Sequence, residues 1–120
     1  MTEARRAAFS RGVDAESVAA RFLEAQGFAL VAQRVRTPRG ELDLVMRRDT
    51  LLVFCEVKAR ARLEAAAESL QLRQRRRIAE AAEIFLARHP EFDGFDIRLD
   101  VVLVVPGRAP VHLPAAFETD

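Results

Sequence analysis

Three charged residues interrupt two apolar, strand-like segments in the middle of the chain. Asp43 lies in Gly40–Val45, and Glu56 and Lys58 lie in Leu51–Arg60. A charge inside an apolar strand is costly unless it is paired or binds a metal. Two carboxylates that converge on one point suit a hard cation such as Mg²⁺ or Mn²⁺, which leaves positions open for water and a substrate phosphate. We therefore predict a metal site held by Asp43 and Glu56, with hydrolysis of a phosphate ester as its chemistry.

Lys58 is the single lysine among nineteen basic residues. A lysine is a compact point charge that can orient a nucleophilic water or neutralise charge on phosphate oxygens. The alternative is an ion pair of Lys58 with Glu56 or Asp43 that only closes the edge of a sheet. We favour a catalytic role because Asp43 precedes this segment at hairpin spacing and Glu16 lies on the margin of a predicted helix.

A helix over residues 14–26 would position Glu16. Asp14 is a plausible N-cap and Gly27 a plausible C-terminal stop. A strand over residues 28–36 follows, and a turn over residues 37–40 ends it. The expected apolar face of this helix, at 3.6-residue spacing, comprises Ala15, Val18, Ala19, Phe22 and Leu23.

The next two strands are expected over residues 41–46 and 51–58, joined as a hairpin by residues 47–50. If Met46 pairs with Leu51, Asp43 faces Phe54 and is the diagonal neighbour of Glu56. The two Cα atoms would then be roughly 7–8 Å apart. A register slip of one residue would turn one carboxylate to the opposite side of the sheet.

A second helix is expected over residues 70–88, followed by a loop over 91–96, a strand over 97–105, a short edge strand over 111–113 and a helical turn over 114–117. The apolar stripe of this helix becomes polar at Gln71, Gln74 and Arg75, and that end should lie near Glu56. We predict that these three residues, together with Arg60, bind nucleic acid. The predicted fold is α/β, a mixed β-sheet flanked by helices in the order α-β-β-β-α-β-β.

Length and composition predict a single domain over residues 12–120 after a flexible tail over residues 1–11. The lone cysteine and the lack of a spanning apolar segment favour a cytoplasmic protein that does not contact membranes. Residues 34–77 hold twelve basic residues against six acidic ones. This local excess predicts a polyanionic partner, nucleic acid and DNA in the first place, bound near the carboxylates. A homodimer is a further expectation.

Several motifs together resemble a known family. The YraN-like family of bacterial proteins, within the PD-(D/E)xK restriction-endonuclease-like superfamily that includes Holliday-junction resolvases, is similar over nearly the whole chain. The resemblance implies a restriction-endonuclease-like fold and a metal nuclease site with Asp43, Glu56 and Lys58 at its core and Glu16 as the helix-borne acid. It rests on Gly12-x(3)-Glu16-x-x-Ala19, Gln26-Gly27-Phe28, Gly40-Glu41-Leu42-Asp43-Leu44, Phe54-x-Glu56-Val57-Lys58-Ala59-Arg60, Arg75-Arg76-Arg77-Ile78 and Leu99-Asp100-Val101-Val102.

The predicted function is therefore a Mg²⁺-dependent nuclease acting on structured or branched DNA. The alternative is a nucleic-acid-binding module on a nuclease fold without activity of its own, since a fold does not fix a function. Glu41, which faces Glu56 in the expected register, is either a further metal ligand or a solvated glutamate. Asp100 is expected to cap a backbone or pair with an arginine, and His112 and Cys55 are expected to be structural.

Overall fold

The computed structural model describes residues 15–61 and 72–116 of the chain. Its elements follow the predicted order, and a short 3₁₀ helix overlaps the start of the segment expected to be a loop. The predicted tail, the N-cap Asp14, and residues 70 and 71 of the second helix lie outside the described residues. The elements are a first helix over residues 15–24, β1 (Ala29–Thr37), β2 (Gly40–Arg48), β3 (Leu51–Ala59), α3 (Leu72–Arg88), η1 (Pro90–Phe92), β4 (Asp96–Val104) and β5 (Val111–Leu113).

The five strands form one mixed sheet in the order β1-β2-β3-β4-β5. β1, β2 and β3 run antiparallel to one another, β4 is parallel to β3, and β5 is antiparallel to β4. The parallel pair is joined through α3, as a crossover connection requires. This is the predicted α/β architecture, and it is consistent with a restriction-endonuclease-like fold. Among the described residues, no helix is long and apolar enough to cross a membrane.

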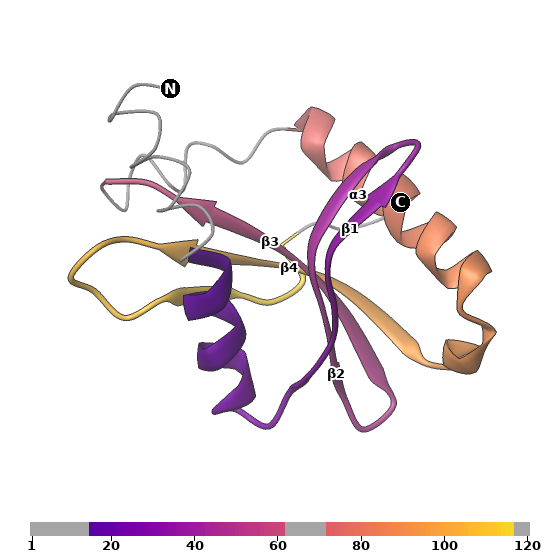
Figure 1. The fold of residues 1–120 in the computed structure, drawn as a ribbon, viewed down its shortest axis with the longest axis horizontal. Coiled ribbons are helices and arrows are strands. Elements are labelled where there is room, and N and C mark those ends of the chain that lie inside the picture. Colours follow the sequence, from indigo (N-terminus) through magenta and orange to yellow (C-terminus); the bar gives the residue numbers. More distant parts are fainter. Residues whose placement is uncertain (1–14, 62–71, 117–120) are drawn as a thin grey trace.

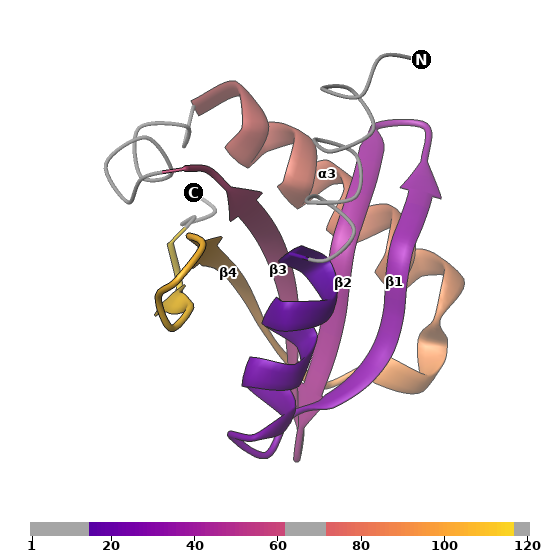
Figure 2. The same cartoon turned by 60° about the vertical axis from the view of Figure 1, so that its left-hand side comes forward.

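Each face of the sheet is covered by one helix (Figures 1 and 2). On one face, the predicted stripe of α3 is buried, and Phe85 meets Phe54 edge to face with ring centroids 5.6 Å apart. Burying such a side chain contributes roughly 1.5–3 kcal/mol. The residues of α3 in this core are Ile78, Ala81, Ala82 and Phe85.

On the other face, the first helix packs Ala19 and Leu23 against Val53 and Cys55 of β3. Burial raises the pKa of the Cys55 thiol, which therefore stays protonated and acts as a packing group, as predicted. The expected apolar face of this helix is wrong at Val18, which is 41% exposed. Ala20 is buried in its place, so the contact stripe is rotated toward the small side chains that let the helix approach the sheet.

The β2–β3 hairpin differs from the expected register by two residues. Its loop has two residues, Asp49 and Thr50, and Met46 pairs with Val53 rather than with Leu51. Asp49 has a φ of 54°, which a two-residue hairpin turn favours and aspartate tolerates. The strands therefore continue through residues 47 and 48, which the sequence had placed in the loop.

Those two arginines extend the strands because their side chains pack on aromatic rings. The guanidinium carbon of Arg47 lies 4.8 Å from the ring centre of Phe95, and that of Arg48 lies 4.3 Å from the ring centre of Phe28. Such cation–π contacts cover apolar surface while the charge stays in water.

Candidate metal centre at the break in β2

Asp43 lies where strand β2 changes the face on which it packs. Leu42 belongs to the core beneath α3, whereas Leu44 belongs to the core beneath the first helix. Residues two apart in a regular strand point to the same face, so the alternation is broken at Asp43. The break lets the Asp43 side chain leave the alternating pattern of the sheet.

The pairing on both sides of β2 is also interrupted here, because the β1–β2 ladder skips one pair and the β2–β3 ladder ends one residue before Asp43. Gln33 pairs with Leu44 and Val35 pairs with Leu42, but no pair joins the residues between them, which are Arg34 and Asp43. The β2–β3 ladder ends with Leu44 and Cys55. The next residues on those strands are Asp43 and Glu56, so the two predicted ligands follow the last pair directly. The predicted pairing of Asp43 with Phe54 is wrong, since Phe54 pairs with Val45.

Asp43 is held between β2 and β3 by one backbone hydrogen bond. The N–H of Val57 donates to its Oδ2 at 2.9 Å. Burial, followed by the negative charge of Glu56, raises the pKa of Asp43 to about 8, although the Val57 hydrogen bond acts in the opposite direction. Two carboxyl groups this close and this buried disfavour a double negative charge. Without a cation, Asp43 therefore retains its proton near neutral pH.

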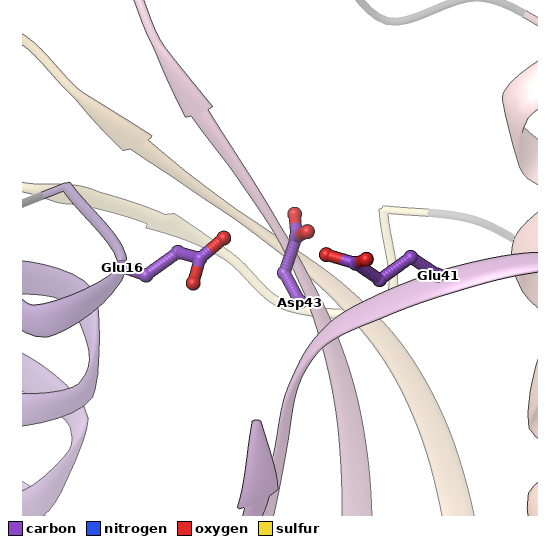
Figure 3. Close-up of side chains that lie close together, drawn as sticks. All are labelled: Glu16, Glu41 and Asp43. Carbon is purple, nitrogen blue, oxygen red and sulfur yellow. The ribbon is translucent and has the colours of Figure 1, made fainter. Parts of the chain in front are cut away.

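Glu16 and Glu41 approach Asp43 from opposite sides (Figure 3). One carboxylate oxygen from each of the three residues lies within 4.8 Å of the others. Glu16 comes from the first helix and Glu41 from the start of β2, two residues before Asp43. Hard divalent cations prefer oxygen ligands of this kind. The donor set therefore fits Mg²⁺ or Mn²⁺ and excludes a thiolate-type zinc site among the described residues.

Glu56 and Lys58 form an ion pair beside this cluster. The Nζ of Lys58 lies 3.2 Å from Oε1 of Glu56, and the side chains are 8% and 13% exposed. A buried pair of this kind is compatible with both interpretations of Lys58, the structural and the catalytic one. Glu56 meets Asp43 directly, but it is not one of the three residues whose oxygens form the compact cluster.

Of the four predicted nucleic-acid-binding residues, the structure describes the side chains of Arg60 and Arg75. Gln71 and the side chain of Gln74 lie outside the described part of the chain. Arg75 is exposed on α3. Arg60 follows β3, and its Nη1 donates to the Ala59 carbonyl at 2.7 Å while its backbone N–H donates to the carbonyl of Val104 at 3.2 Å. The guanidinium bond of Arg60 is therefore local, whereas its backbone bond joins the end of β3 to the end of β4.

Two arginines that were not predicted as site residues lie at or beside the site. The Nε of Arg34 donates to Oε2 of Glu16 at 2.8 Å. Arg77 of α3 lies across Gly40, because a Cβ atom at Gly40 would come within 2.7 Å of its Cγ. The sequence motifs quoted above include both Gly40 and Arg77, although they do not indicate that the two residues meet. Nothing in the sequence indicates the geometry of Arg34.

Asp100 lies apart from this cluster and is fully buried in β4. Arg98 donates to both of its oxygens at 2.8 and 2.9 Å, Nε2 of His112 lies 2.6 Å from Oδ2, and the N–H of Ala115 donates to Oδ1 at 2.9 Å. Burial favours the protonated acid, but these hydrogen bonds outweigh it and hold the pKa of Asp100 below its usual value. Asp100 therefore binds Arg98 and the backbone of the C-terminal segment at Ala115. Both the expected arginine pair and the expected backbone cap are present.

The chain is similar to known proteins over a range that includes all of the site residues. The model of "Uncharacterised protein family UPF0102" matches residues 15–104. A UPF0102 protein of Azorhizobium caulinodans is 57% identical over 99% of this chain and 93% of its own length. UPF0102 proteins of Rhodopseudomonas palustris (strain BisB18) and Bradyrhizobium diazoefficiens are 53% and 49% identical, each over 95% of this chain and over 84% and 86% of their own lengths. The matched range contains every carboxylate of the cluster.

Proposed function

The chain belongs to Uncharacterised protein family UPF0102, and from its site we propose that it is a metal-dependent nuclease that hydrolyses phosphodiester bonds. The observation that carries this proposal is the approach of Glu16, Glu41 and Asp43 to within 4.8 Å at the break in β2, beside the buried Lys58. Three carboxylates at one point are strongly unfavourable unless a cation shares their charge. A divalent cation is the simplest such partner.

Each residue has a distinct role in the proposed reaction. Asp43, Glu16 and Glu41 offer oxygen ligands. Glu56 lies next to Asp43 and adds negative charge beside this ligand. A bound Mg²⁺ or Mn²⁺ would supply charge stabilisation and an acidified water. The ammonium of Lys58 is held by Glu56 on the same side of β3. From that position it can neutralise the phosphate oxygens or orient the attacking water.

DNA is the first substrate to test. Residues 34–77, which contain Asp43, Glu56 and Lys58, carry the basic excess of the chain. Arg75 and Arg77 are exposed on α3, and Arg60 is exposed after β3. Such side chains bind phosphates without reading sequence, so structured or branched DNA would be selected by shape. The expected compartment is the cytoplasm, where a lone thiol such as Cys55 stays reduced.

A second candidate is a nucleic-acid-binding module without activity. It is favoured by the protein cations that already face three of the carboxylates. Arg34 lies 2.8 Å from Glu16, Lys58 lies 3.2 Å from Glu56, and Arg36 lies 3.8 Å from Glu41. Asp43 is the exception, since its described hydrogen-bond donor is a backbone N–H. This exception is why we place the nuclease first.

Cleavage assays separate the two candidates. Linear, flapped and four-way DNA, together with single-stranded RNA, would be incubated with the protein in Mg²⁺ or Mn²⁺. We expect cleavage of at least one substrate, its loss on addition of EDTA, and a decrease of at least about 100-fold in Asp43→Asn. The exposed Asp93→Asn serves as the matched control and should keep full activity. Retained binding without cleavage of any substrate would support the module instead.

A further inference from the structure

Arg34 has a backbone conformation that arginine rarely adopts. Its φ is 50°, although it lies in the middle of strand β1. Glycine, asparagine and aspartate occupy this left-handed region more readily, because other side chains clash with the backbone there. The other two described non-glycine residues with positive φ, Asp49 and Ala115, lie in turns. A strained residue inside a strand persists only where the surrounding structure fixes it.

The strained residue stands beside the carboxylate cluster. The β1–β2 ladder pairs Gln33 with Leu44 and Val35 with Leu42, so Arg34 occupies the position across from Asp43. This is the position at which β2 changes face. The positive φ of Arg34 and the face change of β2 therefore lie at the same point of the β1–β2 pair, beside the proposed metal site, whereas the register shift of this pair lies earlier, between Leu30 and Ala32.

The unusual backbone lets the Arg34 side chain reach Glu16. Its Nε donates to Oε2 of Glu16 at 2.8 Å, and the side chains are 44% and 17% exposed respectively. Among the described residues, the Glu16 side chain has no other hydrogen bond or ion pair. Without Arg34, this carboxylate would be free to rotate from the margin of the first helix toward water. With Arg34, one of its oxygens is fixed and the other is left for a cation.

We propose that Arg34 is a positioning residue, which holds Glu16 over Asp43 and Glu41 for metal binding. This inference rests on the proposed function, because it assigns Glu16 to the metal. Partners of this kind, which hydrogen-bond a ligand rather than the metal, orient the ligand and commonly raise metal affinity. The charge of Arg34 opposes a bound cation, but this side chain is nearly half exposed and water screens it. The orienting effect therefore outweighs the repulsion.

Titration of Mn²⁺ binding, followed by the electron paramagnetic resonance of free Mn²⁺, tests the proposal without an activity assay. The variant Arg34→Asn removes the guanidinium while asparagine tolerates the backbone conformation. Arg34→Gly provides a second variant that also accepts positive φ. We expect both to fold and to bind Mn²⁺ about tenfold more weakly than the native protein. Arg39→Asn is the control for lost charge, since Arg39 faces Glu80 at 3.7 Å and not the cluster.

A double-mutant cycle identifies the route of the effect. If Arg34 acts through Glu16, then Arg34→Asn should add nothing to the loss of Mn²⁺ affinity already caused by Glu16→Gln. Unchanged or tighter binding in Arg34→Asn, or fully additive losses in the double variant, would overturn the positioning role.

The variant Asp43→Asn distinguishes a wrong role for Arg34 from a wrong metal site. If Asp43→Asn abolishes binding while Arg34→Asn does not alter it, only the role of Arg34 is wrong. If Asp43→Asn binds Mn²⁺ like the native protein, the proposed metal site itself is wrong.

Discussion

Asp43 accepts a hydrogen bond from the backbone N–H of Val57, and the distance from N to Oδ2 is 2.9 Å. This bond joins β2 to β3 at the point where their ladder has ended with Leu44 and Cys55. It places a buried carboxyl group next to Glu56, and the consequence is the raised pKa of Asp43. The strands thus hold a carboxyl group whose ionisation is disfavoured by burial. Perturbed pKa values of this kind are common at functional sites.

The first prediction concerns the stability of the metal-free protein against pH. The folded-state pKa of Asp43, about 8, lies above its ordinary value of 3.8. The protonated Asp43 therefore stabilises the folded state at low pH. This contribution to the free energy of unfolding is lost as the pH rises from about 4 to 8, by at most about 1.4 kcal/mol per pH unit. In EDTA, Asp43→Asn should be more stable than the native protein at pH 8 and equal to it at pH 4.

Denaturant unfolding at several pH values measures this difference, with the exposed Asp93→Asn as the control that should follow the native curve. A native protein in EDTA whose stability relative to Asp43→Asn does not change between pH 4 and pH 8 would contradict the raised pKa.

The second prediction separates the structural and catalytic roles of Lys58. Lys58→Met leaves the carboxylate of Glu56 without its partner at 3.2 Å, and losing one member of a buried pair costs about 3 kcal/mol. The double variant Lys58→Met, Glu56→Gln should recover most of this stability, because no unpaired charge is left. Activity should stay at least about 100-fold low in both variants. Recovery of cleavage together with stability would show that the pair is only structural.

The third prediction concerns the contact between Gly40 and Arg77. Gly40 has a φ of 143°, and a Cβ there would lie 2.7 and 2.8 Å from Cγ and Cδ of Arg77. Gly94 has a φ of 85° and open space where its Cβ would stand. Gly94→Ala should cost about 1–2 kcal/mol of backbone strain. Gly40→Ala should cost about 1–3 kcal/mol more, because the arginine stem must move.

Thermal or denaturant unfolding of the two alanine variants measures the excess. Adding Arg77→Ala to Gly40→Ala should remove that excess, since the obstructing Cγ and Cδ are then gone. Equal losses of stability in Gly40→Ala and Gly94→Ala would mean that the Arg77 side chain moves aside at no cost, contrary to the prediction.

The fourth prediction concerns the Asp100 cluster. The pKa of Asp100 is lowered in the folded state, so its charge stabilises the fold above the pKa of the unfolded chain and the contribution is lost as the pH falls through the folded-state pKa. Asp100→Asn should cost about 3 kcal/mol at pH 7, because Arg98 loses its charged partner. The difference from the native protein should shrink in acid. Asp96→Asn, exposed on the same strand, should be neutral, and an equal loss there would contradict the role of Asp100.

Sequence periodicity predicted the order of the elements and the burial of α3, since both depend on local patterns of apolar residues. The β2–β3 register could not be predicted, because it depends on the packing of Arg47 on Phe95 and of Arg48 on Phe28. The error was two residues, and a shift of two keeps every side chain on its face. Asp43 meets Glu56 as predicted, although the pairs were wrong and the alternation of β2 is broken at Asp43 itself.

The left-handed backbone of Arg34 had no local signal, since arginine itself does not favour it. Glu41 was expected to be either a further metal ligand or a solvated glutamate, and its carboxylate lies in the cluster with Glu16 and Asp43. Sequence spacing could identify carboxylates of the site, but the departure from regular strand geometry decides which of them converge.

Anomalous diffraction from crystals soaked in Mn²⁺ would locate the proposed metal. We expect a manganese peak at coordination distance, about 2.1 Å, from the Asp43 carboxylate and from at least one of Glu16, Glu41 and Glu56. The same soak of Asp43→Asn crystals should show no peak there. A native crystal without manganese at Asp43, or a peak of equal height in the Asp43→Asn crystal, would contradict the account.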